Sequence, residues 1–414
     1  MKNEFQLIAT AAFGLESLVK RELTDLGYTI ESTENGRVYF SGGPEAIIET
    51  NLWLRCADRV LLKVGEFKAE TFDELYEKTK ALPWQKFIPA KAAFPAAKIT
   101  SVKSKLFSKS DGQRIVKKAV ADKLMAAYKT RVLPETGPGF PIQIRILKDM
   151  VTLSIDTSGS GLHKRGYRQY GNEAPIKETI AAALVMLSRW NPSRPFLDPM
   201  CGSGTIVIEA AMIGKNMAPG LQKQFISETW PMFYPGQWEQ ARRNAKAAEN
   251  DLSFRVIGSD IDARSLKQAR TNAEKAGVTD YVAFQRIDLK NIVTKKKYGV
   301  IVTNPPYGER IGEVKTLRPL YVEMGKVFRS LDDWSYFIIT AYPDFQKVFG
   351  EKATRNRKIY NSTIKTYFYE YFGPLPPRRK PRPQTDAVPE GDLPESGAPE
   401  KEAVTGTGKQ DNGQ

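Results

Sequence analysis

The sequence predicts an α/β fold, with a mainly parallel sheet in the second half of the chain and smaller α+β units in the first half. In the second half, apolar strand patterns end in polar residues and alternate with helix patterns, which is typical of parallel sheets with helical crossovers. In the first half, the expected order over residues 5–64 is β-α-β-β-α-β, which is ferredoxin-like. Residues 355–372 form two extended patterns around a turn, so we expect a terminal antiparallel hairpin on the parallel sheet.

A second α+β unit is expected over residues 71–158. Helix patterns cover Phe72–Ala81 and Asp111–Tyr128, and two strand patterns, Ile142–Ile146 and Val151–Ile155, close the unit. A long excursion, residues 212–253, interrupts the parallel-sheet half. Its aromatic cluster at Trp230–Tyr234 either pins the excursion onto the core, which we favour, or stacks on flipped bases.

The Asn-Pro-Pro-Tyr stretch at 304–307 directly follows Val300–Val302, an apolar, β-branched run that predicts a buried strand. Prolines end such a strand because they cannot donate to its ladder. Open α/β sheets bind ligands at this end of their strands. The Asn304 side-chain oxygen and the Pro305 carbonyl suit an NH2 group held by both hydrogens, and the Tyr307 ring suits a flat base. The predicted catalytic residues are Asn304, Pro305, Pro306 and Tyr307.

A glycine-rich loop separates the strand that ends at Asp198 from the apolar helix that follows Thr205. The loop lacks the Gly-Lys-Ser/Thr of a Walker motif and is not Gly-x-Gly-x-x-Gly. An acid at this strand end suits a ligand that carries an ammonium group better than a dinucleotide pyrophosphate. The predicted cofactor-binding residues of the loop are Asp198, Pro199, Met200, Cys201, Gly202, Ser203, Gly204 and Thr205.

Two more acids follow the next two strand patterns. Asp260, with Ile261 after it, ends the strand at 254–259, and an acid at the end of the second strand usually holds ribose hydroxyls. Asp288 follows the strand at 282–286 and could reach an adenine amino group. Together with Asn304 after the fourth strand, these residues complete the predicted cofactor site.

These motifs together resemble the class I (Rossmann-like) S-adenosylmethionine-dependent methyltransferases that modify exocyclic amines. More narrowly, the chain resembles the bacterial THUMP-domain RNA methyltransferases, whose best-known members make N2-methylguanine in large-subunit (23S) ribosomal RNA. The resemblance rests on Asp198–Thr205, Gly258–Asp262 and Asn304–Arg310, together with Leu162–Arg168 and Glu173–Glu178, and it extends to about Gly373.

The resemblance implies four parts: a ferredoxin-like domain at 1–65, a THUMP RNA-binding domain at 66–160, a methyltransferase domain at 161–373 and a tail at 374–414. The tail is rich in Pro, Glu and Gly, which predicts disorder. The resemblance also implies S-adenosylmethionine as cofactor and guanine N2 as the methyl acceptor, although the Asn-Pro-Pro-Tyr motif accepts adenine N6 as well. A helix at 173–187 is expected to line the cofactor pocket.

The formal net charge of +15 favours a polyanionic partner such as nucleic acid or an anionic membrane surface. Lysines interleaved with Phe107 lie at 103–118, where they form either a phosphate-tracking surface or a solvated helix face. The resemblance to THUMP domains favours RNA. The linker at 162–171 is also basic and contains His163, the only histidine, for which packing or RNA proximity is a better reading than catalysis because amine methylation needs no base. The predicted RNA-binding residues are Lys103, Lys105, Lys109, Lys117, Arg165 and Arg168.

Several alternatives can be weighed from the sequence. Pyrimidine carbon-5 methylation needs a cysteine nucleophile near the base, and neither Cys56 nor Cys201 is suitably placed. A DNA adenine or a glutamine-amide methyltransferase would share the motif but would not need the RNA-binding half. An N6-adenine RNA methyltransferase and a cofactor-binding assembly factor without turnover stay open. The absence of a signal peptide or membrane-spanning run predicts a cytoplasmic protein with no membrane partner. We expect no metal, and the oligomeric state is open.

Overall fold

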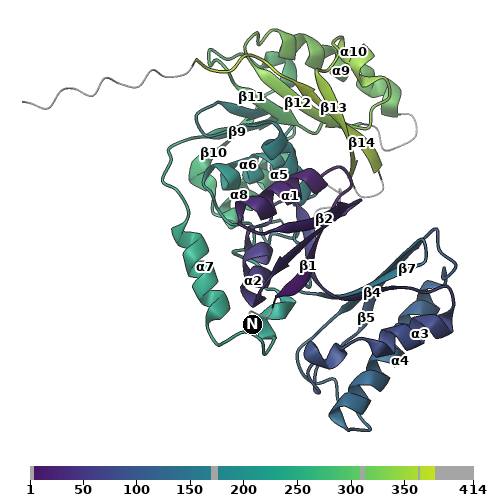
Figure 1. The fold of residues 1–414 in the computed structure, drawn as a ribbon. Coiled ribbons are helices and arrows are strands. Elements are labelled where there is room, and N and C mark those ends of the chain that lie inside the picture. Colours follow the sequence, from purple (N-terminus) through teal and green to yellow (C-terminus); the bar gives the residue numbers. More distant parts are fainter. Residues whose placement is uncertain (1–3, 169–175, 308–312, 362–363, 378–414) are drawn as a thin grey trace, which may run out of the picture. The chain divides into compact units, whose positions relative to one another are not determined.

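The computed structural model describes residues 4–168, 176–307, 313–361 and 364–377, with the backbone alone at 313–316 (Figure 1). The chain divides into two units, 1–375 and 376–414. The first unit contains two seven-stranded sheets, and the description below concerns that unit. The predicted disordered tail lies outside the described residues from residue 378 onward.

The amino-terminal unit has the predicted β-α-β-β-α-β order. Leu18, Val19 and Leu23 form the buried stripe of its first helix, which ends before Gly27, a residue with a positive φ of 88°. The strands pair in the order β2-β3-β1-β4, and all of these pairs are antiparallel. The elements are β1 (Phe5–Ala11), α1 (Glu16–Asp25), β2 (Ile30–Glu34), β3 (Arg37–Gly42), α2 (Pro44–Trp53) and β4 (Ala57–Lys68).

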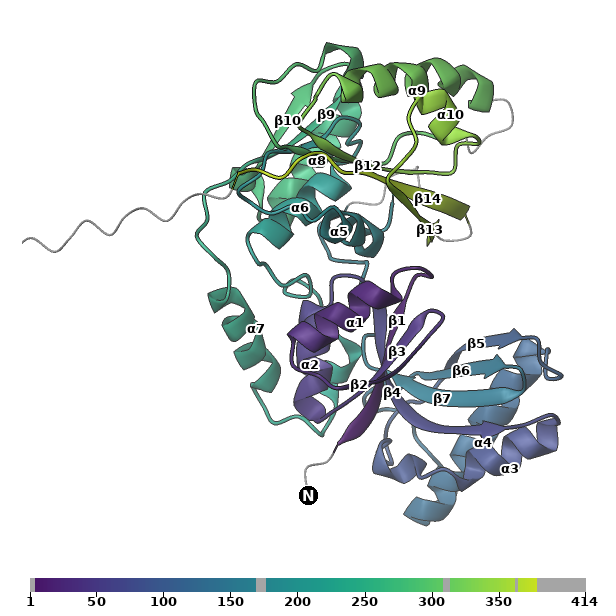
Figure 2. The same cartoon turned by 45° about the horizontal axis from the view of Figure 1, so that its top comes forward.

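Strand β4 is 12 residues long and belongs to both amino-terminal units. It pairs with β1 through Leu61 and Leu62, and its second half pairs with β7, with a register shift between Lys63 and Gly65. A side chain at Gly65 would come within 2.5 Å of the Leu82 side chain, so glycine leaves room for Leu82 beside the register shift. The predicted boundary between residues 65 and 66 therefore falls inside a continuous strand (Figure 2).

The second unit extends the same sheet in the order β4-β7-β6-β5. Its helix α3 has the predicted bounds, and α4 begins two residues before the predicted Asp111. Thr71 caps α3 because its hydroxyl accepts a hydrogen bond from the Glu74 amide. The elements are α3 (Phe72–Ala81), β5 (Ala96–Val102), α4 (Lys109–Tyr128), β6 (Ile142–Leu147) and β7 (Met150–Asp156).

The second sheet has the order β10-β9-β8-β11-β12-β14-β13. Strands β8 to β12 are parallel, and β14 runs antiparallel to β12 and β13, which confirms the predicted terminal hairpin. The strands are β8 (Phe196–Asp198), β9 (Val256–Asp260), β10 (Val282–Arg286), β11 (Val300–Thr303), β12 (Ser335–Thr340), β13 (Arg355–Asn361) and β14 (Ile364–Tyr371). The helices are α5 (Glu178–Leu187), α6 (Thr205–Gly214), α7 (Gln237–Ala247), α8 (Ala263–Ala276), α9 (Glu313–Arg329) and α10 (Phe345–Phe349). The helix predicted over 173–187 begins later, at Glu178, because Lys177 is extended and serves as its N-cap; residues 173–175 lie outside the described residues.

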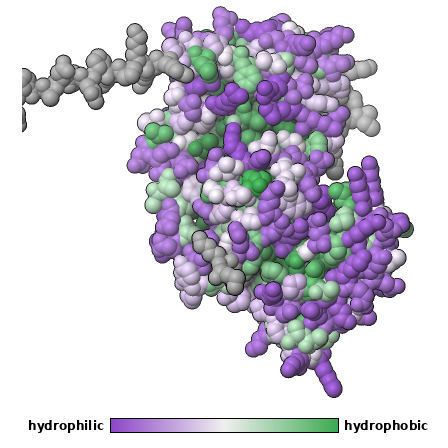
Figure 3. Space-filling model, in the orientation of Figure 1, coloured by the Kyte–Doolittle hydropathy of each residue, from purple (hydrophilic) through white to green (hydrophobic). Residues whose placement is uncertain are grey.

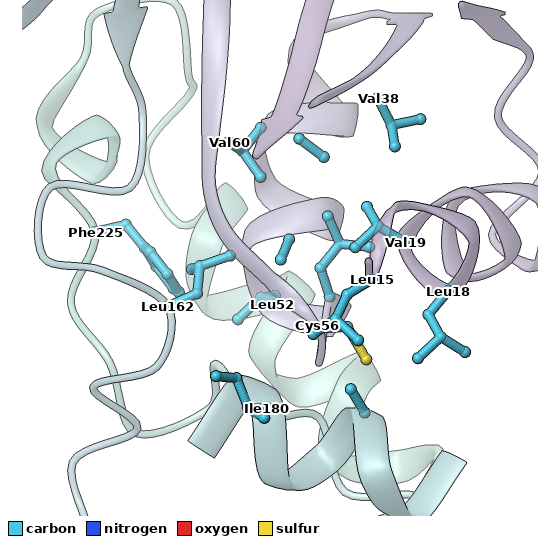
Figure 4. Packing of buried hydrophobic residues seen from close by; sticks show 14 of the residues in the cluster. Leu15, Leu18, Val19, Val38, Leu52, Cys56, Val60, Leu162, Ile180 and Phe225 are labelled. Carbon is cyan, nitrogen blue, oxygen red and sulfur yellow. The ribbon is translucent and has the colours of Figure 1, made fainter. Parts of the chain in front are cut away.

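One hydrophobic cluster contains residues from both halves of this unit (Figure 4). Leu15 and Leu52 come from the first sheet's helices and loops, while Ile180 and Phe225 come from the methyltransferase half. Arg55 fastens the same region by donating a hydrogen bond to the carbonyl of Met217 at 2.8 Å.

The excursion at 212–253 is pinned by its aromatic residues, as we favoured. Trp230 stacks on Phe140 with ring centroids 4.4 Å apart and donates a hydrogen bond to the Gly139 carbonyl. Trp238 stacks on Phe225. Trp230 is 2% exposed, so its ring is not available to a flipped base. Within the described residues, no helix is long and apolar enough to cross a membrane.

Candidate active site

Polar side chains gather where β8, β9 and β11 end. Asp198 is the last residue of β8 and Asp260 the last of β9, and Asn304 directly follows β11. Because β8 lies between β9 and β11 in a parallel sheet, these three residues share one edge. The structure therefore brings together the strand ends that the sequence analysis singled out.

The glycine-rich loop is fastened to the end of β9. The Gly202 amide donates to the Asp260 carboxylate at 2.9 Å, and the Cys201 amide donates to the Ser259 carbonyl at 3.0 Å. Gly202 and Gly204 have positive φ values of 50° and 82°. A side chain at Gly204 would also come within 3.0 Å of Ala269 and of Phe284. The loop thus needs its glycines, and it delivers the chain to the start of α6 at Thr205.

Asp198 is a buried carboxyl group. It is 1% exposed and accepts a hydrogen bond from the Met200 amide at 3.3 Å. Burial raises the pKa of Asp198 to about 7. No ion pair within the described ranges involves this residue. A ligand's ammonium group would supply the missing positive charge, so the site fits a cofactor with an amino-acid end.

The second acid, Asp260, uses one oxygen for Gly202 and the other for the Asp262 amide at 3.0 Å. Each carboxylate oxygen can accept a further bond, which leaves capacity for ribose hydroxyls. Asp262 has a different role because it caps α8, accepting from the amides of Arg264 and Ser265. Ile261, predicted as a cofactor contact, is 63% exposed beside this edge.

Asp288 lies just beyond β10. It accepts a hydrogen bond from the Lys290 amide at 3.2 Å and forms an ion pair with the Lys290 ammonium at 3.3 Å. These contacts lower the pKa of Asp288 and keep it ionised. Its side chain is 43% exposed, so its contact with an adenine amino group stays a prediction.

A buried tyrosine that was not predicted from the sequence holds the Asn-Pro-Pro-Tyr segment in place. Tyr321, on α9, donates its hydroxyl to the Pro306 carbonyl at 2.9 Å and contacts the Thr340 hydroxyl at 2.8 Å. Tyr321 is fully buried, and Thr340 is the last residue of β12. Thr340 could have been found from sequence because it ends a strand next to β11, but Tyr321 lies in an amphipathic helix with no distinguishing motif.

Tyr307 lies in the core in this structure. It is 8% exposed and belongs to an apolar cluster with Leu197 and Tyr321. Pro305 is buried, Pro306 exposed and Asn304 partly buried. Stacking of Tyr307 on a base would therefore require its ring to leave this cluster, and that role stays a prediction. Gly308–Arg310, part of the motif, lie outside the described residues.

Neither cysteine is placed to act as a nucleophile, because both are buried. Cys201 is 7% exposed, and its sulfur would lie 3.0 Å from a side chain added at Gly258. Burial raises the pKa of the Cys201 thiol, and the pKa of the Cys56 thiol is raised in the same way. Both groups therefore stay protonated, which agrees with the argument against carbon-5 chemistry.

The predicted RNA-binding lysines differ in their exposure and in whether an acidic side chain already pairs with them. Lys103 is exposed at a positive φ of 50°, and Lys109 begins α4. Lys105 is 65% exposed and pairs with Glu70, whereas Lys117 is paired with Glu135 at 2.6 Å. The face in Figure 3 is largely hydrophilic. The exposed lysines stay candidates for phosphate contact, with Lys117 the least available.

Arg165 and Arg168 do not fit the predicted contact with RNA. The Arg165 side chain is 2% exposed, pairs with Glu209 at 3.5 Å and donates to the Leu162 carbonyl. Arg168 pairs with Glu178 and donates to the Thr205 hydroxyl at 2.9 Å. Both guanidinium groups fasten the linker to α5 and α6. Acidic side chains inside the protein therefore neutralise most of the linker's positive charge. Arg165 and Arg168 are not part of the RNA-binding site.

Three family models match consecutive parts of the chain. The RlmL ferredoxin-like domain matches residues 6–61, and the THUMP domain matches residues 69–156. The RMKL-like methyltransferase domain matches residues 165–369. These ranges agree with the two joined α+β units and the parallel-sheet half.

Similar proteins match over most of their length. The candidate RNA methyltransferase YpsC of Bacillus subtilis (strain 168) is 48% identical over 91% of this chain and 98% of its own. A predicted N6-adenine-specific DNA methylase from Listeria monocytogenes str. 4b F2365 is 51% identical, with a TM-score of 0.85, over 90% of this chain and 97% of its own. SMU.472, a candidate methyltransferase whose crystal structure contains SAH, is 45% identical, with a TM-score of 0.85, over 91% of this chain and 100% of its own.

Proposed function

This chain belongs to the family of methyltransferases that join an RlmL-type ferredoxin-like domain and a THUMP domain to an RMKL-like methyltransferase domain, and on that premise we propose that it methylates the exocyclic 2-amino group of a guanine in RNA. The protein is an RNA methyltransferase, and its cofactor is S-adenosylmethionine. The observation that carries amine methylation is the meeting of Asp198, Asp260 and Asn304 at one sheet edge. The choice of guanine rests on the RlmL-type domain.

The cofactor-holding residues are proposed from their chemistry. The buried Asp198 would pair with the cofactor's ammonium group, and Asp260 would accept from its ribose hydroxyls. The loop at 199–205 would pass close to it because two of its residues are glycines with positive φ. Asp288 and Ile261 would bound the adenine. The bound cofactor supplies an electrophilic methyl group, so the protein mainly has to align donor and acceptor.

The acceptor amine is proposed to lie against the end of β11. The Asn304 side-chain oxygen and the Pro305 carbonyl would accept its two hydrogens and turn its lone pair toward the methyl group. These contacts would favour a tetrahedral nitrogen and disperse the positive charge that develops on it. The proton can leave after transfer, so no general base is required. Tyr307 would contact the base plane, and Pro306 would hold the segment through its bond to Tyr321.

The substrate is proposed to be large-subunit ribosomal RNA, or the particle that contains it, in the cytoplasm. The THUMP unit and the charge of +15 support RNA over DNA. The same motif accepts adenine N6, and the Listeria relative is described as an adenine-specific DNA methylase. A paired target base would have to be flipped at a cost of a few kcal/mol.

The proposal is tested by supplying radiolabelled S-adenosylmethionine and total RNA from a strain that lacks the protein, and then identifying the labelled nucleoside. Label in N2-methylguanine, located in 23S RNA by fragment analysis, is the expected result. Label in N6-methyladenine would keep the amine mechanism and overturn the guanine assignment. Failure to label either free RNA or isolated ribosomal subunits, with cofactor binding intact, would favour a binding factor without turnover.

A further inference from the structure

A polar cavity of about 340 Å³ lies on the seven-stranded sheet that the two amino-terminal units share. Three parts of the chain line it: the ferredoxin-like strands, the THUMP strands and the linker to the methyltransferase domain. We call it the junction pocket and define it by Arg37, Arg59, Lys98, Arg145, His163 and Lys177. None of these residues takes part in the cofactor or methyl-transfer site described above.

The sheet curves around the junction pocket. Arg145 is on β6 and Glu34 is on β2, and four strands lie between these two in the sheet. Their side chains nevertheless form an ion pair at 2.9 Å. The strands therefore bend into a trough, and this ion pair spans it. A pocket built in this way is part of the fold and not a chance gap between side chains.

Positive charge exceeds negative charge in the pocket. Its lining contains five Lys or Arg side chains and one carboxylate, Asp58. Two of the arginines are paired outside the lining: Arg59 with Asp156, and Arg145 with Glu34. Five cations against these three acids leave a net charge of +2. Lys98 and Lys177 form no ion pair within the described residues. The pocket therefore suits an anion.

Arg37 provides an independent indication of a ligand. Its residue is 9% exposed, and its Nη1 is buried without a hydrogen-bond partner. The hydroxyl of Tyr39, two residues along the same strand, interacts with the Arg37 guanidinium and is itself buried. A buried, unpaired guanidinium donor costs free energy, which an anion in the pocket would recover. Arg37 lines the pocket, so the unused donor belongs to the cavity.

We propose that the junction pocket binds a phosphate group of single-stranded RNA and thereby anchors the substrate on the amino-terminal half. The volume lies near the lower end of the range for small-ligand pockets, roughly 300–1,000 Å³. A cavity of this size suits a phosphate group and its neighbouring sugar better than a whole duplex. Among the lining residues of the described chain there is no Phe, Tyr or Trp, and cationic side chains predominate, so phosphate is the main group recognised.

This inference rests on the proposed function for the identity of the ligand as RNA, but its test does not require methylation. His163 is the only histidine of the chain and lines the pocket, so a tag-free protein labelled at histidine gives one imidazole signal in a nuclear magnetic resonance spectrum. That signal reports binding in this pocket directly, whether or not the enzyme turns over.

The titrant is a five-nucleotide RNA of mixed sequence, used in three forms: with hydroxyls at both ends, with a 5′-phosphate and with a 3′-phosphate. Inorganic phosphate is the fourth arm. We expect saturable shifts of the His163 signal. Equal shifts for all three RNAs would assign an internal phosphodiester, and larger shifts for one phosphorylated form would assign that terminus.

The test variant is Lys98→Ala combined with Lys177→Ala, and the control is Lys347→Ala combined with Lys352→Ala, which removes the same charge from exposed positions of the methyltransferase domain. The test variant should weaken RNA binding about tenfold and lower the salt slope of log K by about 0.7, the share of one single-strand phosphate. The control should leave both unchanged.

The inference would be overturned if no RNA shifted the His163 signal, or if the shifts persisted unchanged in the test variant. If RNA is methylated under those conditions, the proposed function stands and the pocket assignment alone fails. If RNA moves the His163 signal but is never methylated, the pocket assignment stands and the proposed function fails. A response to an acidic peptide, without one to RNA, would assign the pocket to a protein partner instead.

Discussion

The Asp260 carboxylate accepts a hydrogen bond from the Gly202 amide at 2.9 Å, and this bond joins the end of β9 to the glycine-rich loop after β8. The acid therefore shapes the loop, and we propose that its remaining acceptor capacity serves the ribose hydroxyls of the cofactor. Asp262, two residues later, caps α8 and has no contact with the loop among its hydrogen bonds. Variants of Asp260 and Asp262 can therefore separate the effect of an acid on cofactor binding from its effect on helix stability.

Asp260→Ala should weaken cofactor binding at least about tenfold, because it removes a charged hydrogen bond to the loop and the ribose acceptors together. Isothermal titration with S-adenosylmethionine measures this. Asp262→Ala is the matched control and should lower the free energy of unfolding by about 1 kcal/mol through loss of the cap, with little change in affinity. Equal affinity losses in both variants would mean that Asp260 acts only through stability.

Asp198→Asn should stabilise the cofactor-free protein at neutral and alkaline pH. The pKa of Asp198 is about 7 in the fold against a usual 3.8, so the folded state retains a proton that the unfolded chain has lost between these values. Stability contributed by this group is therefore lost as pH rises from about 4 to about 7, by at most about 4 kcal/mol.

Urea unfolding between pH 4.5 and 8.5 measures the effect. The variant should lack this part of the pH slope, exceed the native chain at pH 8 and bind S-adenosylmethionine much more weakly. Asp288→Asn is the control because the pKa of Asp288 is lowered, so its loss should not stabilise the protein at pH 8. A native-chain stability that is independent of pH between 4.5 and 7 would contradict the burial argument.

Much of the candidate site follows from sequence because the strand ends of a parallel sheet meet by geometry. Asp198, Asp260 and Asn304 could be placed together from three strand patterns alone. The boundary predicted between residues 65 and 66 lies between the ranges of the two family models, which end at residue 61 and begin at residue 69. The sequence did not show that one strand, with a bulge at Gly65, continues across it to Lys68. A sequence pattern indicates where a strand begins more readily than it indicates that one strand belongs to two structural units.

The errors in the linker have a different origin. Arg165 looked like a phosphate contact because charge is visible in sequence and burial is not. Its partner Glu209 lies 44 residues later, on the buried side of α6. The contact of Tyr321 with Pro306 was missed for the same reason: it joins α9 to the loop after β11 through packing, and neither residue alone indicates it.

Asn304→Ala should lower the turnover number by at least about 100-fold, because it removes a positioned acceptor from the amine in the transition state. Cofactor affinity should stay near the native value, as measured by titration. Asn361→Ala, a change of the same type at the end of β13, should leave turnover unchanged. An unaltered rate in Asn304→Ala would remove this residue from the chemistry.

Tyr321→Phe should lower the turnover number several-fold while leaving cofactor affinity intact, because the Pro306 carbonyl loses its hydrogen bond and the acceptor segment loosens. The free energy of unfolding should fall by about 1 kcal/mol. Tyr371→Phe is the matched control: its hydroxyl donates to the Glu351 carbonyl in the same apolar cluster and should cost similar stability without a change in rate. Equal rate losses in both variants would show that stability, and not positioning, explains the effect.

Replacing Lys103, Lys105 and Lys109 together by Ala should weaken RNA binding and flatten its dependence on salt, because each phosphate contact releases counterions when it forms. The effect should be less than that of three free cations because Lys105 is paired with Glu70. Fluorescence anisotropy with an RNA fragment between 50 and roughly 200 mM salt measures both quantities. The matched control replaces Lys295, Lys296 and Lys297, which are exposed just before β11 and therefore near the sheet edge opposite Asn304. If the two triple variants have the same salt slope, the lysines at 103–109 do not contact phosphate, and the positive charge of the THUMP unit acts only through long-range attraction.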